Sequence, residues 1–408
     1  MKKNCLNCKK KLKTVFLNLG RSPIANNFSK KQTLKKKFNL TAMVCDSCYL
    51  VQVDPKIKPE DFFEDYSYQS GHSLTWLRHC KNLSDVLIKK FSIKKSDTIL
   101  EIASNDGTQL SIFKKMGFKN LFGVDPSKNL SLVLKKKKIN IFCNFFSKKF
   151  SDFLIKKKIF PKIIIANNVI AHIPQINDFC LGVSNILEKS AGIASIEFHY
   201  LINLIKKKQF DTIYHEHHFY HSLYTLNNIL EKNNLKIFDL QKINTHGGSI
   251  RIFVAHKNNL KFNITNKVKK QIRYEISIGI NNILFYKKFK EDIKNFKKYF
   301  IKKFSYILKK YNKIAAYGAA AKGTTFLNFM NINKKKLTCV YDKNPYKQNR
   351  YMAGSLIPVR SPSFLIKDKP DVILVLIWNL KKEIIKQLKF TKKWNCKIIF
   401  PLPKFSIF

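Results

Sequence analysis

Short apolar runs alternate with lysine-rich helical stretches through the middle of the chain. Four runs of β-branched or aliphatic residues stand at 98–103, 120–125, 162–167 and 193–198. A strand–helix rhythm of this kind builds a largely parallel sheet with helices on both faces, because each crossover helix must pack back onto the sheet. The pattern therefore predicts an α/β fold.

The chain is too long for one such unit. Its 408 residues exceed the roughly 250–300 at which a single hydrophobic core stops growing. Between 284 and 308 apolar side chains recur every three or four positions among lysines. This predicts an amphipathic helix that joins two domains, although the same pattern also suits a helix lying on a membrane surface. A second set of α/β runs follows at 313–323, 337–342, 371–378 and 397–403.

Two CxxC pairs stand near the N-terminus, Cys5 with Cys8 and Cys45 with Cys48. Pairs at this spacing can clamp one zinc ion from two turns, and four thiolates leave no open position for catalysis. A redox dithiol is the alternative, but neither pair opens a helix of a thioredoxin-like unit. We therefore expect a structural zinc site and three domains, at 1–72, 73–280 and 281–408, the last of which includes the linker helix.

The net charge of +51 raises the question of nucleic-acid binding. Only six of the 77 basic residues are arginine, and the lysines are spread over the whole length. Because base-edge and bidentate phosphate recognition favours arginine, this composition argues against a nucleic-acid partner. The longest apolar run, 372–378, is far shorter than the roughly 20 residues of a membrane-spanning helix, and the first residues show no apolar stretch of roughly 7–15 residues such as a signal peptide contains. We expect a cytoplasmic monomer without a nucleic-acid or membrane partner.

A polar turn follows the first central strand. Glu101 lies in that strand, the turn contains Asn105, Asp106 and Gly107, and Asp125 ends the next strand. The carboxyl ends of parallel strands form a nucleoside-binding crevice, in which Asp125 would accept both ribose hydroxyls. The turn lacks the GxGxxG pattern of a dinucleotide site, and its acidic groups suit a positively charged ligand. It predicts S-adenosylmethionine (SAM), with an ordinary α/β turn as the alternative.

Histidines crowd into residues 211–223, DTIYHEHHFYHSL. The HExxH motif of zinc proteases is excluded, because Phe219 lies four residues after His215. A structural histidine cluster or an adventitious metal site remains an alternative. The favoured interpretation is acid–base chemistry, in which a histidine works near neutral pH, a carboxylate sets its tautomer and a tyrosine donates to a developing oxyanion.

A third motif, YGAAAKGTTFLN at 317–328, follows a predicted strand and opens a helix. Backbone amides at a helix N-terminus, together with Lys322, would hold phosphate oxygens. An ordinary glycine-tightened turn explains the same residues.

In this order the motifs resemble those of the three-domain SAM-dependent C-methyltransferases that act on nucleotide-activated keto-deoxysugars, the group of the tetronitrose C-3′-methyltransferase. The resemblance covers nearly the whole chain. Besides the paired CxxC it rests on seven segments: YSYQSGHS (66–73), EIASNDGT (101–108), ANNVIAHIPQINDF (166–179), DTIYHEHHFYHSL (211–223), THGGSIRIFVAH (245–256), YGAAAKGTTFLN (317–328) and YDKNPYKQNRYMAGSLIPV (341–359).

The resemblance implies a zinc-binding domain, a central Rossmann-like class I SAM methyltransferase domain and a smaller C-terminal Rossmann-like α/β domain that binds the nucleotide-sugar. It assigns His217 as the general base, and the other implied residues are these: Glu216, Tyr214, Tyr68 and His172 in the active site, Asn167 and Asn168 with the cofactor, and Gly318, Lys322, Gly323 and Asn328 with the substrate. Ala103 stands where the family has a glycine, a change that would reshape the cofactor turn.

The sequence thus predicts a SAM-dependent C-methyltransferase acting on a dTDP-linked 4-keto-6-deoxyhexose. A base would remove the proton next to the ketone, and the enolate carbon would attack the SAM methyl group. The alternatives are a SAM-dependent methyltransferase for another nucleotide-linked or small carbonyl substrate, and a zinc-containing nucleic-acid-binding protein.

Overall fold

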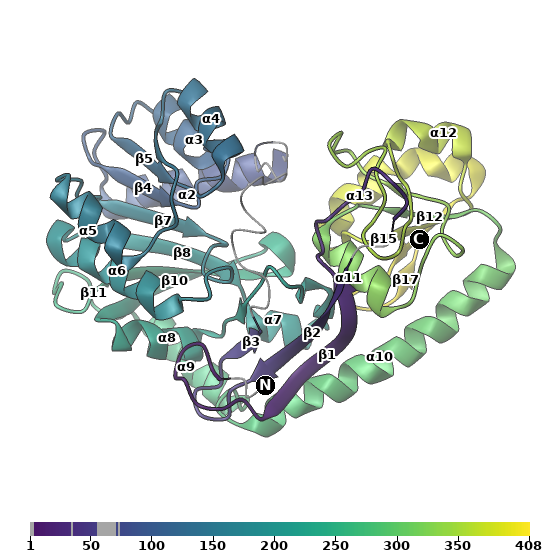
Figure 1. Cartoon of the computed structure of the whole chain (residues 1–408), viewed down its shortest axis with the longest axis horizontal. Coiled ribbons are helices and arrows are strands. Elements are labelled where there is room, and N and C mark those ends of the chain that lie inside the picture. Colours follow the sequence, from purple (N-terminus) through teal and green to yellow (C-terminus); the bar gives the residue numbers. More distant parts are fainter. Residues whose placement is uncertain (1–3, 34–35, 55–70, 72–73) are drawn as a thin grey trace.

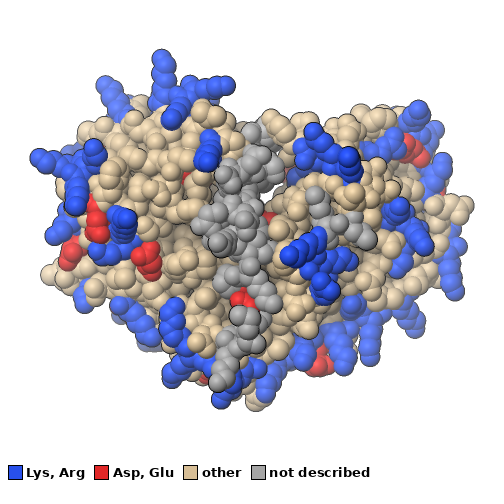
Figure 2. All heavy atoms as spheres, viewed as in Figure 1, with Lys and Arg blue, Asp and Glu red and all other residues tan. Residues whose placement is uncertain are grey.

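The strands of the described residues form three β-sheets (Figure 1). The computed structural model describes residues 4–33, 36–54, 71 and 74–408. Among these residues, no helix combines the length and the apolar character that crossing a lipid bilayer requires. Lysine and arginine side chains are scattered over the face shown in Figure 2 rather than gathered in one patch, as their spacing in the sequence predicted.

The N-terminal sheet has four antiparallel strands in the order β1-β2-β3-β9. They are β1 (Thr14–Pro23), β2 (Lys37–Val44), β3 (Val51–Val53) and β9 (Phe219–Tyr220). Because β9 belongs to the histidine-rich segment, the N-terminal sheet is completed by residues that lie far along the chain.

The central sheet has seven strands in the order β10-β11-β8-β7-β4-β5-β6. The predicted runs form β4 (Ile99–Ile102), β5 (Leu121–Val124), β7 (Ile163–Asn167) and β8 (Ile193–His199), which with β6 (Asn140–Phe142) pair in parallel. The last two, β10 (Leu235–Ile243) and β11 (Ser249–His256), add an antiparallel edge. The expected parallel α/β sheet is therefore confirmed.

Helices cover both faces of this sheet because its strands are apolar on both sides. Along β7, Ile163 and Ile165 pack into one core cluster, and Ile164 and Ala166 into another. The first cluster includes α2 (Leu74–Phe91), α3 (Thr108–Lys115) and α4 (Lys128–Lys136). The second includes α5 (Lys148–Lys156), α6 (Ile176–Ser190) and α8 (Leu223–Lys232). Alternation with a period of two thus directs successive side chains into two cores.

The helix α10 (Ile283–Lys310) confirms the predicted amphipathic helix and runs along the molecule from the N-terminal strands to the C-terminal lobe (Figure 1). Two further helices, α7 (Leu201–Lys206) and α9 (Asn266–Ser277), precede it in the chain. Its Phe289 stacks on Phe16 of β1 with ring centroids 4.8 Å apart, and its Phe300 meets Phe326 of the C-terminal part at 5.1 Å. The apolar stripe of this helix is therefore buried against protein.

The C-terminal sheet has six strands in the order β14-β13-β12-β15-β16-β17, parallel except for the last. The strands are β12 (Ile314–Tyr317), β13 (Val340–Tyr341), β14 (Val359–Arg360), β15 (Val372–Val375), β16 (Lys397–Phe400) and β17 (Ser406–Ile407). The α-helices are α11 (Ala321–Phe329), α12 (Leu365–Asp368) and α13 (Lys381–Gln387). This is the smaller α/β unit that the second set of apolar runs predicted.

Candidate active site

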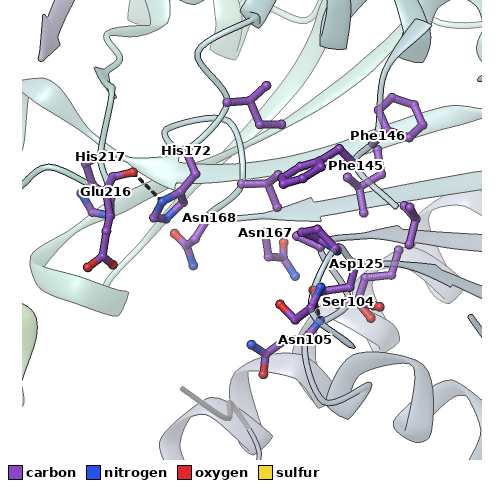
Figure 3. A pocket seen from close by; sticks show the side chains of 18 of the residues that line it. Ser104, Asn105, Asp125, Phe145, Phe146, Asn167, Asn168, His172, Glu216 and His217 are labelled. Atoms are coloured by element: carbon purple, nitrogen blue, oxygen red, sulfur yellow. Dashed lines mark hydrogen bonds between the residues drawn. The ribbon is translucent and has the colours of Figure 1, made fainter. Parts of the chain in front are cut away.

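A cavity of about 630 Å³ opens where β4, β5, β7 and β8 end. Asn26, from the N-terminal part, and Lys322 and Lys347, from the C-terminal part, complete its wall. Figure 3 shows Asn105 and Asp125 at one end of the cavity and the histidines at the other. One cavity therefore connects the two motifs that the sequence assigned to cofactor and to catalysis.

Two backbone N–H groups fix the carboxylate of Asp125. Its Oδ2 accepts from the Asn105 amide and its Oδ1 from the Ser127 amide, both at 2.9 Å. Burial raises the pKa of Asp125, and the hydrogen bonds oppose that shift. Because a carboxylate offers about four lone-pair sites, Asp125 can still accept from a hydroxyl donor of a ligand.

Several buried polar atoms on the cavity wall have no hydrogen-bond partner among the described residues: Oε2 of Glu101, Oγ of Ser104 and both amide atoms of Asn167. Burial raises the pKa of Glu101 well above its usual value, and the charges of Asp106 and Asp125 add to the shift. Such a site favours a ligand that brings positive charge and polar groups. The sulfonium and amino groups of SAM fit this demand.

Asp106 and Gly107 belong to the turn but do not line the cavity. Asp106 accepts hydrogen bonds from the Thr108 hydroxyl at 2.6 Å and from the Gly71 amide at 2.9 Å. Gly107 has φ +71°, and a Cβ there would lie 2.9 Å from Leu134. Both residues therefore shape the turn that carries Asn105.

Ala103 adopts the left-handed backbone that glycine favours, with φ +53°. This conformation costs an alanine roughly 1–2 kcal/mol. Ala103 therefore holds a strained backbone conformation in this turn.

His217 lies at the other end of the cavity. Its Nδ1 is 3.1 Å from the carbonyl of Thr212, so the ring proton resides on Nδ1 and is donated there. Its Nε2 accepts a hydrogen bond from the Tyr214 hydroxyl at 2.9 Å. Burial holds the pKa of His217 well below its usual range, and neighbouring His172 and His199 lower it further. The ring is therefore neutral at pH 7, with the lone pair of Nε2 directed at the Tyr214 hydroxyl.

Glu216 connects this segment to two others. Its carboxylate accepts from Nδ2 of Asn26 at 2.8 and 3.1 Å, and its backbone carbonyl accepts from Nδ1 of His172 at 2.8 Å (Figure 3). Burial raises the pKa of Glu216 to about 7, although Asn26 and the charge of Lys347 act in the opposite direction. Burial also lowers the pKa of His172 to about 4.

The other histidines of the segment, His215, His218 and His221, are buried but do not line the cavity. His215 meets Phe38 edge-on, with ring centroids 6.0 Å apart. Burial lowers the pKa of His218 and His221 to about 4. The segment therefore contains one cavity-facing histidine and three that pack inside the protein.

The C-terminal part contributes lysines to the cavity. Lys322, at the N-terminus of α11, donates to Oδ1 of Asn379 at 2.9 Å, and Nζ of Lys347 donates to the Ala319 carbonyl at 2.8 Å. The other predicted substrate residues, Gly318, Gly323 and Asn328, do not line the cavity.

Asn328 instead donates to the carbonyls of Thr324 and Ala353, and a Cβ at Gly318 would lie 2.6 Å from Ile377. A Cβ at Gly323 would lie 3.1 Å from Leu376. These three residues therefore support the βα turn. Of the remaining predicted residues, Tyr214 and Asn168 line the cavity, and Tyr68 lies outside the described residues.

The cavity residues that the sequence analysis missed include Asn26, His199 and Lys347. The ring of His199 lies 5.7 Å from that of His217. Lys347 lies within the segment 341–359, and His199 directly follows the apolar run at 193–198, whereas no local motif marks Asn26.

The four cysteines form two matching turns. Each turn closes with a hydrogen bond from the residue after the second cysteine to the first, Lys9 to Cys5 at 2.9 Å and Tyr49 to Cys45 at 2.8 Å. The four Sγ atoms lie within 4.8 Å of one another. Four thiols converging in this way fit a tetrahedral zinc ion, so the predicted metal site is confirmed.

Comparisons with known proteins agree with this geometry. Three family models match in order: a "zinc binding domain" at 5–63, a "methyltransferase domain" at 74–240 and a "C-methyltransferase C-terminal domain" at 244–403. C-methyltransferase NovU from Streptomyces niveus is 28% identical over 394 residues, which cover 95% of this chain and 92% of NovU.

The solved structures that match include a SAM-dependent methyltransferase from Clostridium acetobutylicum, at 14% identity, with a TM-score of 0.36 over 44% of this chain and 92% of that one. Another is magnesium protoporphyrin IX methyltransferase from Synechocystis, at 12% identity, with a TM-score of 0.32 over 44% of this chain and 79% of that one.

The fold and the site define a SAM-dependent methyltransferase with an added zinc-binding domain. The chain carries in order the three domains that these family models describe, and it is an enzyme that transfers the SAM methyl group to carbon.

Proposed function

We propose that the acceptor is a nucleotide-activated 4-keto-6-deoxyhexose, linked to dTDP, and that methylation occurs at the carbon next to the ketone. The observation that carries this proposal is the single cavity in which a buried neutral histidine, an acidic cofactor end and two lysines meet. Carbon becomes nucleophilic beside a ketone once a base removes the neighbouring proton. The site offers such a base, and the lysines offer cations for a diphosphate.

His217 is the proposed base. Donation from Nδ1 to the Thr212 carbonyl orients the ring and leaves Nε2 to accept the proton of the sugar carbon. The electron pair of that C–H bond moves to the ketone oxygen, and Tyr214, beside Nε2, is placed to donate a hydrogen bond to the resulting enolate oxygen while it keeps its proton. Glu216 and His172 hold the segment in register, and Tyr68 is proposed as a further active-site residue.

SAM, when bound, supplies the methyl group and leaves as S-adenosylhomocysteine. We propose that Asp125 holds its ribose and that Glu101 faces its positive end, with Asn105, Asn167 and Asn168 beside them. Asp106 and Gly107 act through the turn. The carbon–carbon bond forms with the electron pair of the enolate, and His217 then returns its proton to solvent.

Lys322 and Lys347 are the proposed diphosphate contacts. Burial lowers the pKa of Lys322, and the nearby carboxylate of Asp211 opposes that shift. A cation that faces the cavity from a helix N-terminus suits a phosphate oxygen. Gly318, Gly323 and Asn328 support this contact by fixing the turn.

The test is methyl transfer from labelled SAM across a panel of nucleotide-linked 4-keto-6-deoxyhexoses. The proposed base has its own test in D₂O with the keto-sugar and S-adenosylhomocysteine, where wild-type enzyme exchanges deuterium into the carbon next to the ketone. His217→Asn should abolish this exchange and lower turnover about 10²–10⁴-fold, with little change in SAM affinity. Exchange lost on His199 or His172 substitution instead would reassign the base. No transfer and no exchange with any keto-sugar would overturn the substrate class.

A further inference from the structure

Gln52 lies between the cysteine cluster and the histidine-rich segment. Its Nε2 is 3.2 Å from Sγ of Cys5, and its Oε1 accepts from the amide of Leu6 at 2.9 Å. The side chain is only 2% exposed. A buried amide that uses both of its ends on one cysteine turn fixes that turn relative to β3.

The strand that carries Gln52 also pairs with the histidine-rich segment. In the antiparallel pairing of β3 with β9, Gln52 stands opposite Phe219. The amide of Val53 donates to the carbonyl of His218 at 2.9 Å. Since β9 begins two residues after His217, a shift of β3 would be transmitted directly to the proposed base.

The opposite side of the segment is held as well. The carbonyl of Ala171 accepts from the amides of His218 and Phe219, at 2.7 and 3.1 Å. His172 donates to the Glu216 carbonyl at 2.8 Å. Residues 216–219 are therefore held from two sides. The loop at 171–172, which follows β7 of the central sheet, contacts one side, and β3 of the N-terminal sheet contacts the other.

We propose that Gln52 is a positioning residue through which zinc at the cysteine site places His217. A zinc-bound thiolate is a stronger hydrogen-bond acceptor than a free thiol, so metal occupancy tightens the contact between Cys5 and Gln52. The tighter contact fixes the position of β3, and the pairing of β3 with β9 fixes the backbone next to His217. The zinc site thus acts on the reaction as well as on the stability of its own domain. This inference rests on the proposed role of His217.

The experiment compares Gln52→Met with Thr41→Val in the full-length, zinc-loaded protein. Methionine fills the same space but cannot donate to Cys5 or accept from Leu6. Thr41→Val is the matched control, because it removes a 3.2 Å hydrogen bond to Asn18 in the same sheet without touching β9. Amide hydrogen exchange is read on peptides covering 214–221 and, as an internal reference, on β12 and β15. Zinc content, kcat and the KM for SAM are measured on the same samples.

We expect Gln52→Met to keep its zinc at saturating metal, to exchange faster across 214–221 and to lose about 10–100-fold in kcat with the KM for SAM unchanged. Removal of zinc from wild-type protein by a chelator should reproduce the faster exchange at 214–221 while the reference peptides stay protected. The proposal is overturned if 214–221 stays protected in both cases, or if Thr41→Val has the same effects. Exchange needs no sugar, so its result stands apart from any failure of the proposed substrate.

Discussion

Replacing Glu216 by glutamine should stabilise the protein, and the gain should grow with pH. The carboxyl group is 3% exposed, and its main hydrogen-bond donor is the neutral amide of Asn26. Glutamine has nearly the same shape and can still accept from Asn26. The substitution therefore removes a buried charge with little change in packing.

The size of the effect follows from the pKa of Glu216, which is about 7 in the folded protein against an ordinary value of 4.5. The folded state binds more protons than the unfolded state between these values, so the stability that this carboxyl contributes is fully present below pH 4.5 and is lost as the pH rises through 7. A shift of this size corresponds to about 3 kcal/mol. Glutamine does not titrate. The free energy of unfolding of the variant, relative to that of wild type, should therefore increase by about 3 kcal/mol between acid pH and pH 8.5.

Thermal unfolding at pH 5.0 and pH 8.5 measures this difference. Unfolding a chain of 408 residues carries an entropy of roughly 0.9 kcal/mol/K, so the Tm of Glu216→Gln minus that of wild type should rise by about 3 °C between the two conditions. Glu231→Gln, at an exposed position on α8, controls for the loss of a negative charge as such. A Tm difference that is the same at both pH values would refute the buried-charge reasoning, because Glu216 would then ionise as it does in the unfolded chain.

Three further predictions concern the metal, the cofactor and the strained turn. Purified protein should contain about one zinc, measured by elemental analysis, and Cys45→Ala with Cys48→Ala should remove it; full retention would contradict the tetrahedral site. Asp125→Ala should weaken SAM binding about 10–100-fold in calorimetric titration, since charge-assisted hydrogen bonds to the ribose are lost, and unchanged affinity would move the cofactor elsewhere. Ala103→Gly should raise stability by about 1 kcal/mol in chemical denaturation, because glycine adopts positive φ without strain. Ala191→Gly, at φ +48° on the surface, should raise stability by a similar amount. If neither substitution raises stability, backbone strain at these alanines is excluded.

Local patterns in the sequence were enough to predict the elements and the metal site. The runs at 98–103 and 162–167 became β4 and β7 because apolar residues on both faces of a strand require a buried parallel sheet. The CxxC spacing determines where both cysteines of a turn point, so the zinc site needed no knowledge of the rest of the fold.

The contacts that complete the candidate site could not be predicted in the same way. Asn26 and Glu216 are 190 residues apart in the chain, and they meet only because β9 joins the N-terminal sheet. Thr212 acts through its backbone carbonyl, which every residue type possesses. Asp106 has the residue type of a ligand group, but its oxygens are used on Thr108 and Gly71. Long-range topology and backbone geometry decide these cases, and neither leaves a mark in a short motif.

The helix α10 sets the spacing of the whole molecule. At 28 residues it is about 42 Å long, and its aromatic stripe contacts β1 through Phe289, the start of the histidine-rich region through Phe296 on Phe210, and α11 through Phe300. A single residue inserted between Phe289 and Phe296 would turn everything beyond it by about 100° and advance it by about 1.5 Å, which would misalign all later contacts at once. This helix can therefore change its surface residues freely during evolution, whereas its length is fixed by three distant partners.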